Sequence, residues 1–228
     1  MKNIHIVGAL HGNEPFGERV INKLKRTDFS NNLSFTIGNP DAFDRKIRFI
    51  ETDLNRSFGL SVKSKEAVIA DAITAKLEQI NPEIIIDIHS SISEVGVVAI
   101  LAKESNVLYE VASAVGASTI VVMSPELSKH SLIGQFAAKS LSLEFGSDST
   151  HVKDLNIATE RILHLGDSEL ALNPSIPVLK VTGVIDKNYK DLPTIENLQF
   201  NGALNGYPFL AGQDNYPDMG GFLCERLF

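Results

Sequence analysis

Short apolar runs alternate with amphipathic segments over the first 165 residues of the chain. The apolar runs predict strands at residues 4–7, 33–37, 83–89, 97–101, 119–123 and 140–145. Helices are predicted at about residues 13–25, 64–80, 107–115 and 154–163. This alternation is typical of an α/β fold in which a mixed central sheet is flanked by helices.

The helix predicted over residues 64–80 has the clearest periodicity. Its apolar residues Ile69, Ile73, Leu77 and Ile80 recur at helical spacing, which defines a buried face. The charged residues of the same segment fall elsewhere and are expected to face solvent; they are Lys65, Glu66, Asp71 and Lys76. In the strand that follows, three consecutive isoleucines at 84–86 indicate a strand covered on both faces.

The pattern changes after Leu165. Five prolines, at positions 174, 177, 193, 208 and 217, separate β-like pieces such as residues 178–184. We therefore expect an α/β domain over residues 1–165 and a small β-rich C-terminal region over residues 166–228.

Composition excludes several classes of protein. The chain has 228 residues and a net charge of −7, which disfavours general binding to nucleic acid. No apolar run approaches the roughly 20 residues needed to span a bilayer, and residues 1–9 carry no secretion signal. Cys224 is the single cysteine, so no disulfide forms within the chain. These features favour a cytoplasmic protein without a membrane or nucleic-acid partner.

Ionisable residues follow three of the predicted strands. His11 and Glu14 follow the first strand, His89 ends the isoleucine strand, and Glu144 lies near the end of the strand at 140–145. Ligands of α/β proteins bind beyond the carboxyl ends of strands. Two histidines and a glutamate that leave a fourth position open form a catalytic zinc set, so His11, Glu14 and His89 are candidate ligands. Taken singly, a histidine at a strand end is more often a packing residue than a ligand, and it is the joint pattern that favours a metal site.

Four other residues lie near these candidates in the sequence. Gly8 and Gly12 are expected to let the backbone turn sharply beside a metal. Asp87 lies two residues before His89 on the same side of the strand, so it is either a partner of His89 or a buried structural carboxylate. His5, inside the first strand, is expected to be structural.

A second group of polar residues lies at Arg48, Asp53, Asn55 and Arg56. Arginine side chains bind carboxylates through paired, charge-assisted hydrogen bonds. The alternative is a solvated loop with surface ion pairs. Glu144 is a candidate general base, because a glutamate that closes an apolar strand is partly desolvated and its pKa is raised. Its alternative role is to cap nearby N–H groups.

Four motifs occur in an order that resembles a known family. They are GALHGNE at 8–14, NPDAFDRKIRFIETDLNRSF at 39–58, DIH at 87–89 and EFG at 144–146. Together they resemble the succinylglutamate desuccinylase/aspartoacylase family of the zinc carboxypeptidase clan. The resemblance implies hydrolysis of the amide bond of a small, anionic N-acyl amino acid, with one Zn²⁺ per chain.

The resemblance also implies a role for each site residue. The zinc ligands would be His11, Glu14 and His89, and Glu144 would be the base that activates zinc-bound water. Arg48 would polarise the scissile carbonyl. Substrate contacts would come from Asn55 and Arg56, which clamp the α-carboxylate, from Asp53, which orients the arginines, and from Tyr216 of the C-terminal region.

The chain departs from the family at one position. Aspartoacylases read the substrate's side chain with a further arginine, some ten residues before the catalytic glutamate. Here that stretch contains Gly134, and no arginine lies between Arg56 and Arg161. The nearest basic residues are Lys129, His130 and Lys139, and nothing in the sequence shows that one of them replaces the arginine.

Two alternatives to a deacylase stay open. One is a carboxypeptidase or peptidoglycan-peptide amidase of the same clan, which shares the metal, the base and the carboxylate clamp. The other is a non-catalytic zinc-binding or ligand-binding protein on this scaffold. A homo-oligomeric assembly is also left open.

Overall fold

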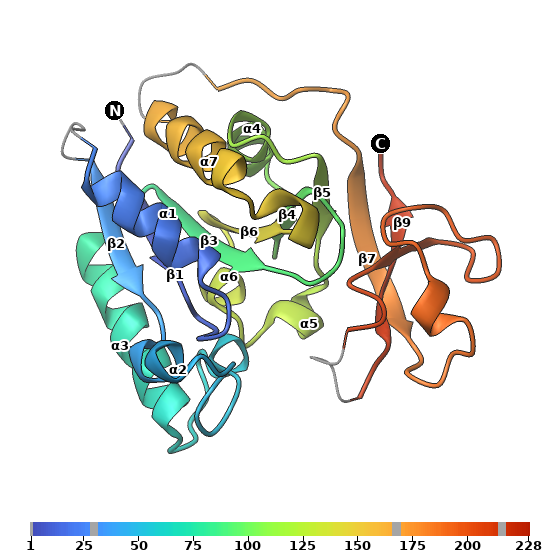
Figure 1. Ribbon diagram of the computed structural model, residues 1–228, viewed down its shortest axis with the longest axis horizontal. Helices are drawn as coiled ribbons and strands as arrows, with labels where there is room; N and C mark the ends of the chain where they lie inside the picture. Colours follow the sequence, from blue (N-terminus) through green and yellow to red (C-terminus); the bar gives the residue numbers. More distant parts are fainter. Residues whose placement is uncertain (1, 28–31, 166–169, 214–217) are drawn as a thin grey trace.

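The computed structural model describes residues 2–27, 32–165, 170–213 and 218–228. Nine strands of this part form one mixed sheet in the order β2-β1-β3-β6-β4-β5-β7-β9-β8 (Figure 1). In chain order the strands are β1 (Ile4–Gly8), β2 (Leu33–Ile37), β3 (Ile84–Ser90), β4 (Val97–Leu101), β5 (Thr119–Val122), β6 (Ser140–Phe145), β7 (Val178–Ile185), β8 (Tyr207–Phe209) and β9 (Gly221–Arg226).

Helices flank the sheet, as the sequence predicts. The α-helices are α1 (Phe16–Lys25), α2 (Pro40–Arg45), α3 (Lys65–Ile80), α4 (Asn106–Ala114), α5 (Pro125–Ser128), α6 (Leu132–Gln135) and α7 (Val152–His164). Three short 3-10 helices are η1 (Leu54–Arg56), η2 (Ser147–Ser149) and η3 (Leu192–Thr194). The mixed α/β fold with a helix-flanked central sheet is confirmed. No helix of the described ranges is both long and apolar enough to cross a membrane.

The direction of the strands decides which strand ends lie close together. The strands β2, β1, β3 and β6 are parallel, so the residues that follow β1, β3 and β6 meet at one edge of the sheet. The strand β4 runs antiparallel to β6 and therefore begins at that same edge. On the side of the sheet away from β2, β7 lies between β5 and β9 and pairs with both, and β9 pairs with β8. The C-terminal strands thus extend the central sheet, and the proposed division at residue 165 stays a prediction.

One face of the sheet is covered by α1, α4 and α7 (Figure 1). Alternate residues of the strands point into this layer, for example Leu141, Leu143 and Phe145 of β6. Because side chains alternate along a strand, Ser142 and Glu144 of β6 point to the opposite face. The same rule places Asp87 and His89 of β3 on that opposite face, because the isoleucines at 84, 86 and 88 pack with the helices.

The opposite face has three zones. At one side, an apolar cluster joins Val7 and Ile85 to Ile73 and Leu77 of α3. At the other side, a second cluster, here called the C-terminal cluster, contains Val95, Val98, Val121, Met123, Leu179, Val181, Phe209, Leu210, Phe222 and Cys224, with Ile100 and Leu127 packed against it. Between these clusters lie the polar side chains of β3 and β6. The candidate site is therefore a polar strip between two apolar regions.

Candidate active site

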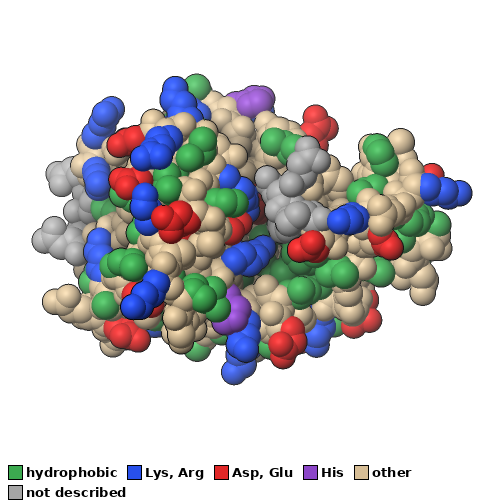
Figure 2. Space-filling view, turned by 90° about the horizontal axis from the view of Figure 1, so that it is seen from below, with side chains coloured by type: hydrophobic (Ala, Val, Ile, Leu, Met, Phe, Trp, Pro, Cys, Tyr) green, Lys and Arg blue, Asp and Glu red, His purple; other side chains and the backbone are tan. Residues whose placement is uncertain are grey.

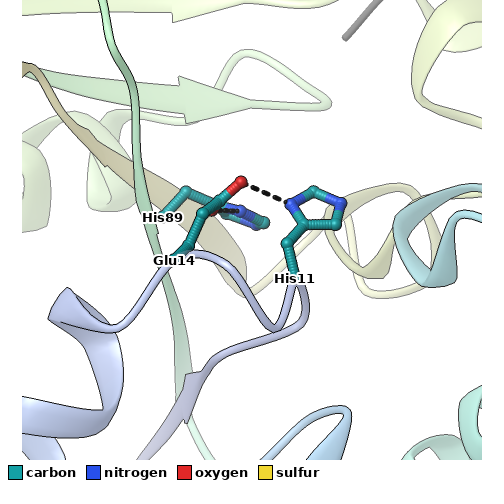
Figure 3. A group of neighbouring side chains, drawn as sticks. All are labelled: His11, Glu14 and His89. Atoms are coloured by element: carbon teal, nitrogen blue, oxygen red, sulfur yellow. Dashed lines mark hydrogen bonds and ion pairs between the residues drawn. The ribbon is translucent and has the colours of Figure 1, made fainter. Parts of the chain in front are cut away.

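Three predicted metal ligands lie close together. His11 and Glu14 come from the loop between β1 and α1, and His89 comes from β3, and their side chains point toward one another (Figure 3). Glu14 Oε1 lies 2.7 Å from His11 Nδ1, and Glu14 Oε2 lies 2.9 Å from His89 Nδ1. One ligand atom from each residue can be chosen so that all lie within 4.8 Å of one another. All three residues are buried.

The outer nitrogen of each histidine ring faces a second carboxylate. His11 Nε2 lies 2.9 Å from Asp53 Oδ1, and His89 Nε2 lies 2.7 Å from Asp87 Oδ2. A metal-binding histidine commonly donates its other N–H to a carboxylate, which fixes the ring and its tautomer. The Nδ1 atoms of both rings then face Glu14 and are free to act as ligand atoms. Two imidazole nitrogens and one carboxylate form a donor set that fits zinc. Asp87 is thus a partner of His89, which decides between the two roles left open for it.

Charges in this cluster shift several pKa values. Burial opposes protonation of both histidines, but the carboxylates of Glu14, Asp53 and Asp87 outweigh it and raise the pKa of His11 and of His89. Burial likewise opposes ionisation of Glu14, but the two imidazoles outweigh it and lower the pKa of that carboxyl. Glu14 therefore stays an anion in the closed site, as a metal ligand must be.

The glycines of the first loop act differently from the prediction. The left-handed residue is Ala9, with φ of 54°, whereas Gly8 and Gly12 are not in the left-handed region. What Gly12 provides is a close approach: a Cβ there would lie 2.1 Å from the backbone carbon of Ala42. A Cβ on Gly8 would lie 2.7 Å from the backbone carbon of Gly17. Both glycines let two backbone segments pack against each other, and this holds the loop that carries His11.

The candidate base Glu144 lies on β6, beside His89. The two residues are register partners in the parallel β3–β6 pair. Burial raises the pKa of Glu144 to about 7, and the negative charge of Glu14 contributes in the same direction. A carboxyl whose pKa lies near neutrality is suited to accept and return a proton at working pH.

The loop before η1 brings Arg48 and Asp53 to the three candidate metal ligands. Arg48 donates from Nη2 and Nε to Asp53 Oδ2 at 2.9 and 3.2 Å, and from Nη1 to Glu14 Oε1 at 3.2 Å. The surface-loop alternative is wrong for this pair, because both side chains are mostly buried, at 16% and 17% exposure. Asp53 contacts His11 as well as Arg48, a double role that the sequence does not show.

The predicted carboxylate clamp lies next to this pair. Asn55 accepts a hydrogen bond from the backbone N–H of Leu132 at 3.0 Å, and its Nδ2 lies 3.4 Å from His89 Nε2. Arg56 is exposed and donates to the backbone oxygen of Asn55 at 2.8 Å. The remaining predicted contact, Tyr216, lies outside the described residues.

Glu66 is a residue that the sequence analysis placed wrongly. It was expected to face solvent on α3, but it is fully buried, at 0% exposure. Its carboxylate accepts hydrogen bonds from the backbone N–H groups of Ile50 at 2.7 Å and Thr52 at 3.1 Å, and from Asn39 Nδ2 at 3.3 Å. Burial alone would raise the pKa of Glu66, but these hydrogen bonds outweigh it and lower the pKa. Glu66 thus anchors the loop between Arg48 and Asp53.

Most of the predicted site residues line one pocket. Among the predicted site residues, the lining contains His11, Glu14, Arg48, Asn55, Arg56, His89 and Glu144. A space-filling view shows basic side chains and a hydrophobic patch near a hollow in the middle of this face (Figure 2). The pocket therefore combines candidate metal ligands, a candidate base and two arginines.

Residues 1–164 match the family model of the succinylglutamate desuccinylase/aspartoacylase catalytic domain. A probable aspartoacylase of Nostoc sp. (strain PCC 7120) is 31% identical over 118 residues, which cover 46% of this chain and 40% of that protein. An N-acyl-aromatic-L-amino acid amidohydrolase of Xenopus laevis is 28% identical over 123 residues, with the same two shares of 46% and 40%. The matched region is thus about two fifths of the length of these curated relatives.

Two solved structures share the fold. The succinylglutamate desuccinylase of Chromobacterium violaceum has a TM-score of 0.81 at 14% identity and covers 99% of this chain and 84% of that one. Murine aminoacylase 3 has a TM-score of 0.75 at 14% identity and covers 99% and 95%. Since the family model spans most of the chain and includes the four motifs named above, this protein belongs to the succinylglutamate desuccinylase/aspartoacylase family.

Proposed function

We propose that this protein is a zinc-dependent amidohydrolase that cleaves the amide bond of an N-acyl amino acid. The observation that carries the proposal is the convergence, in one pocket, of a His-Glu-His donor set, a glutamate of raised pKa and an arginine pair. The family assignment and the amidohydrolase named among the relatives support an amide as the bond that is cleaved.

His11, Glu14 and His89 would hold the zinc, with Asp53 and Asp87 fixing the two rings. Bound there, zinc would act as a Lewis acid that makes water more acidic and polarises the amide carbonyl. Glu144 accepts the proton of the attacking water at its carboxylate and returns it to the leaving nitrogen. The carboxyl's high pKa, caused first by burial, suits both transfers.

The arginines bind and orient the substrate. Arg48 contacts the candidate metal ligand Glu14, so its guanidinium faces the negative charge that develops on the carbonyl oxygen. One such preorganised donor contributes about 3 kcal/mol to the barrier reduction. Arg56 and Asn55 line the same pocket as Arg48 and would hold the α-carboxylate. The amide is then presented to the metal and to Glu144.

The test combines metal analysis with a substrate panel. The zinc-loaded protein is expected to hydrolyse N-acyl amino acids faster than short peptides, and a chelator is expected to abolish the activity. Preference for peptides would favour a carboxypeptidase or a peptidoglycan-peptide amidase. Zinc binding without hydrolysis of any substrate would favour the non-catalytic alternative.

Glu144→Gln tests the role of the base. We expect this variant to keep its zinc and lose at least about 100-fold in kcat, the scale of general-base catalysis. Glu83→Gln, an exposed glutamate before the start of β3, is the matched control and is expected to behave like the wild type. Near-normal turnover in Glu144→Gln rejects the assignment. The cytoplasmic location and a homo-oligomeric state stay predictions.

A further inference from the structure

Part of the pocket lining is apolar. Six lining residues belong to or pack against the C-terminal cluster: Ile100, Met123, Leu127, Phe209, Leu210 and Phe222. They come from β4, the end of β5, α5, the end of β8 and β9. The rings of Phe209 and Phe222 pack with their centroids 6.2 Å apart. These six residues, here called the apolar wall, are thus supplied by one hydrophobic cluster.

Beyond Arg48 and Arg56, the described part of the pocket offers no cation that could bind a second carboxylate of the substrate. Apart from His11 and His89, the basic residues that line the pocket are Arg48 and Arg56. Arg48 is held by Asp53 and Glu14. Residues 214–217, which lie outside the described part, have the sequence DNYP and contain no basic residue.

The basic residues nearest in sequence to the missing arginine do not replace it. Lys129, His130 and Lys139 are all absent from the lining of the pocket. His130 Nδ1 lies 3.0 Å from the backbone oxygen of Phe58, and Lys139 donates to Asn81 Oδ1 at 2.9 Å. The side chains of His130 and Lys139 are thus engaged elsewhere, and Lys129 is exposed outside the pocket lining.

Three serine hydroxyl groups of the pocket lining donate within the protein. Ser128 donates to the backbone oxygen of Ser124 at 3.0 Å, and Ser131 donates to that of Ser128 at 2.7 Å. Ser142 donates to Asp87 Oδ2 at 3.1 Å. A carboxylate placed against the apolar wall would therefore be desolvated without a charged partner, which is strongly unfavourable. An apolar group placed there would bury hydrophobic surface, which is favourable.

We propose that the substrate carries a single carboxylate, bound by Arg56 and Asn55, and that the remainder of the molecule is uncharged and apolar. This rests on the proposed function and narrows its substrate class. Dicarboxylic compounds are excluded, whether the second carboxylate is on the amino acid side chain, as in N-acetyl-aspartate, or on the acyl group, as in an N-succinyl amino acid. The six residues of the apolar wall are the specificity-determining residues.

The first experiment compares kcat/KM of the zinc-loaded protein for four compounds. N-acetyl-L-leucine and N-acetyl-L-phenylalanine are expected to exceed N-acetyl-L-aspartate and N-succinyl-L-leucine by at least about 100-fold, the scale on which a site rejects a group that it leaves unpaired. A dicarboxylic compound hydrolysed as fast as the apolar ones overturns this inference and leaves the proposed function standing. No hydrolysis of any compound overturns both.

A binding measurement gives a readout independent of turnover. In titration calorimetry with the Glu144→Gln variant, N-acetyl-L-leucine is expected to bind, and N-acetyl-L-aspartate to bind at least about 100-fold more weakly. Equal affinity overturns the inference.

A charge placed in the apolar wall tests its position. Leu127 is half-buried on α5, so Leu127→Arg adds a cation that can reach into the pocket. Relative to the neutral control Leu127→Gln, it is expected to raise the ratio of N-acetyl-L-aspartate to N-acetyl-L-leucine hydrolysis by about tenfold or more, since a fixed cation favours the second carboxylate. Thermal unfolding verifies that both variants are folded. An unchanged ratio in folded Leu127→Arg shows that the substrate does not reach this wall and overturns the inference.

Discussion

Glu66 links the stability of the protein to the geometry of its active site. Its buried carboxylate binds the backbone N–H groups of Ile50 and Thr52, in the loop whose two ends carry Arg48 and Asp53. The backbone of the same loop also contacts the loop that carries His11, because the N–H of Gly12 donates to the backbone oxygen of Arg48 at 3.2 Å. A loss of this anchor is therefore expected to affect both folding and catalysis.

The magnitude follows from the hydrogen bonds. A hydrogen bond to a charged group contributes about 1.5–3 kcal/mol net. The shortest of these bonds is that of Ile50, at 2.7 Å; the N–H groups of Glu51 and Thr52 also donate to Glu66, at 3.2 and 3.1 Å, from exposed residues. We therefore expect Glu66→Ala to reduce the free energy of unfolding by about 3 kcal/mol. Glu66→Gln keeps the shape but loses the charge and points an amide NH₂ toward donors, and we expect about 1–2 kcal/mol.

The functional effect follows from the displacement of Arg48. A displacement on the order of 1 Å in a positioning group lowers catalysis about 100-fold, so Glu66→Gln is expected to lower kcat/KM by about 10- to 100-fold. Because Glu66 acts through Arg48 and not on the α-carboxylate clamp, the loss should be mainly in kcat. Urea unfolding and steady-state kinetics are measured on the same preparations.

Glu78→Gln provides the control for this substitution. It makes the same chemical change at an exposed position of the same helix, α3, and is expected to match the wild type in both assays. If Glu66→Gln also matches the wild type within about 0.5 kcal/mol and twofold in kcat/KM, the anchoring role is refuted.

Three other predictions follow from the site and its surroundings. Burial lowers the pKa of His5 to about 4, so its neutral form contributes stability that is complete above pH 6.5, its unfolded value, and is lost as the pH falls toward 4. Between pH 7 and pH 5 the free energy of unfolding of wild type should therefore fall by about 2 kcal/mol more than that of His5→Gln; parallel urea curves would contradict this. Gly12→Ala should displace the loop that carries His11, because of the clash with Ala42, and weaken zinc binding by at least about tenfold; calorimetric affinity equal to that of wild type would contradict it. Since the pKa values of His11 and His89 are raised in the metal-free protein, zinc binding must release protons, and its affinity should be higher at pH 8 than at pH 6; titrations in buffers of different ionisation enthalpy count the protons, and an affinity independent of pH is the contrary result.

Much of the sheet and its main helices could be predicted from the sequence, because their signals are local. Each of the six predicted strands matches an observed strand to within one residue at either end. The helices α2 and η1 were not predicted, since they are too short for a periodic apolar pattern and depend on caps. Asn39 accepts from the N–H of Ala42, and Asp53 accepts from the N–H of Asn55. Asn39 before Pro40 is a helix-start signal in the sequence, but a helix of six residues has no repeated apolar face to support it.

The candidate site divides in the same way. Strand ends placed His11, Glu14 and His89 together in the prediction, because parallel strands bring their carboxyl ends to one edge. The role of Asp53 beside His11 and the burial of Glu66 were not predictable. A charged residue outside the apolar stripe of a helix normally faces solvent, but here the loop that contains Ile50 and Thr52, which precedes α3 in the chain, covers Glu66.

The pairing of β7 with β5 has a consequence for attempts to shorten the protein. The segment that matches the family model ends at residue 164, before β7 begins. Cutting the chain there would expose the hydrogen-bonding edge of β5, whose four residues are all buried, and would remove Phe209 and Phe222 from one wall of the pocket. An apolar strand with an unpaired edge recruits strands from other molecules. A fragment of residues 1–164 should therefore self-associate rather than serve as a minimal enzyme.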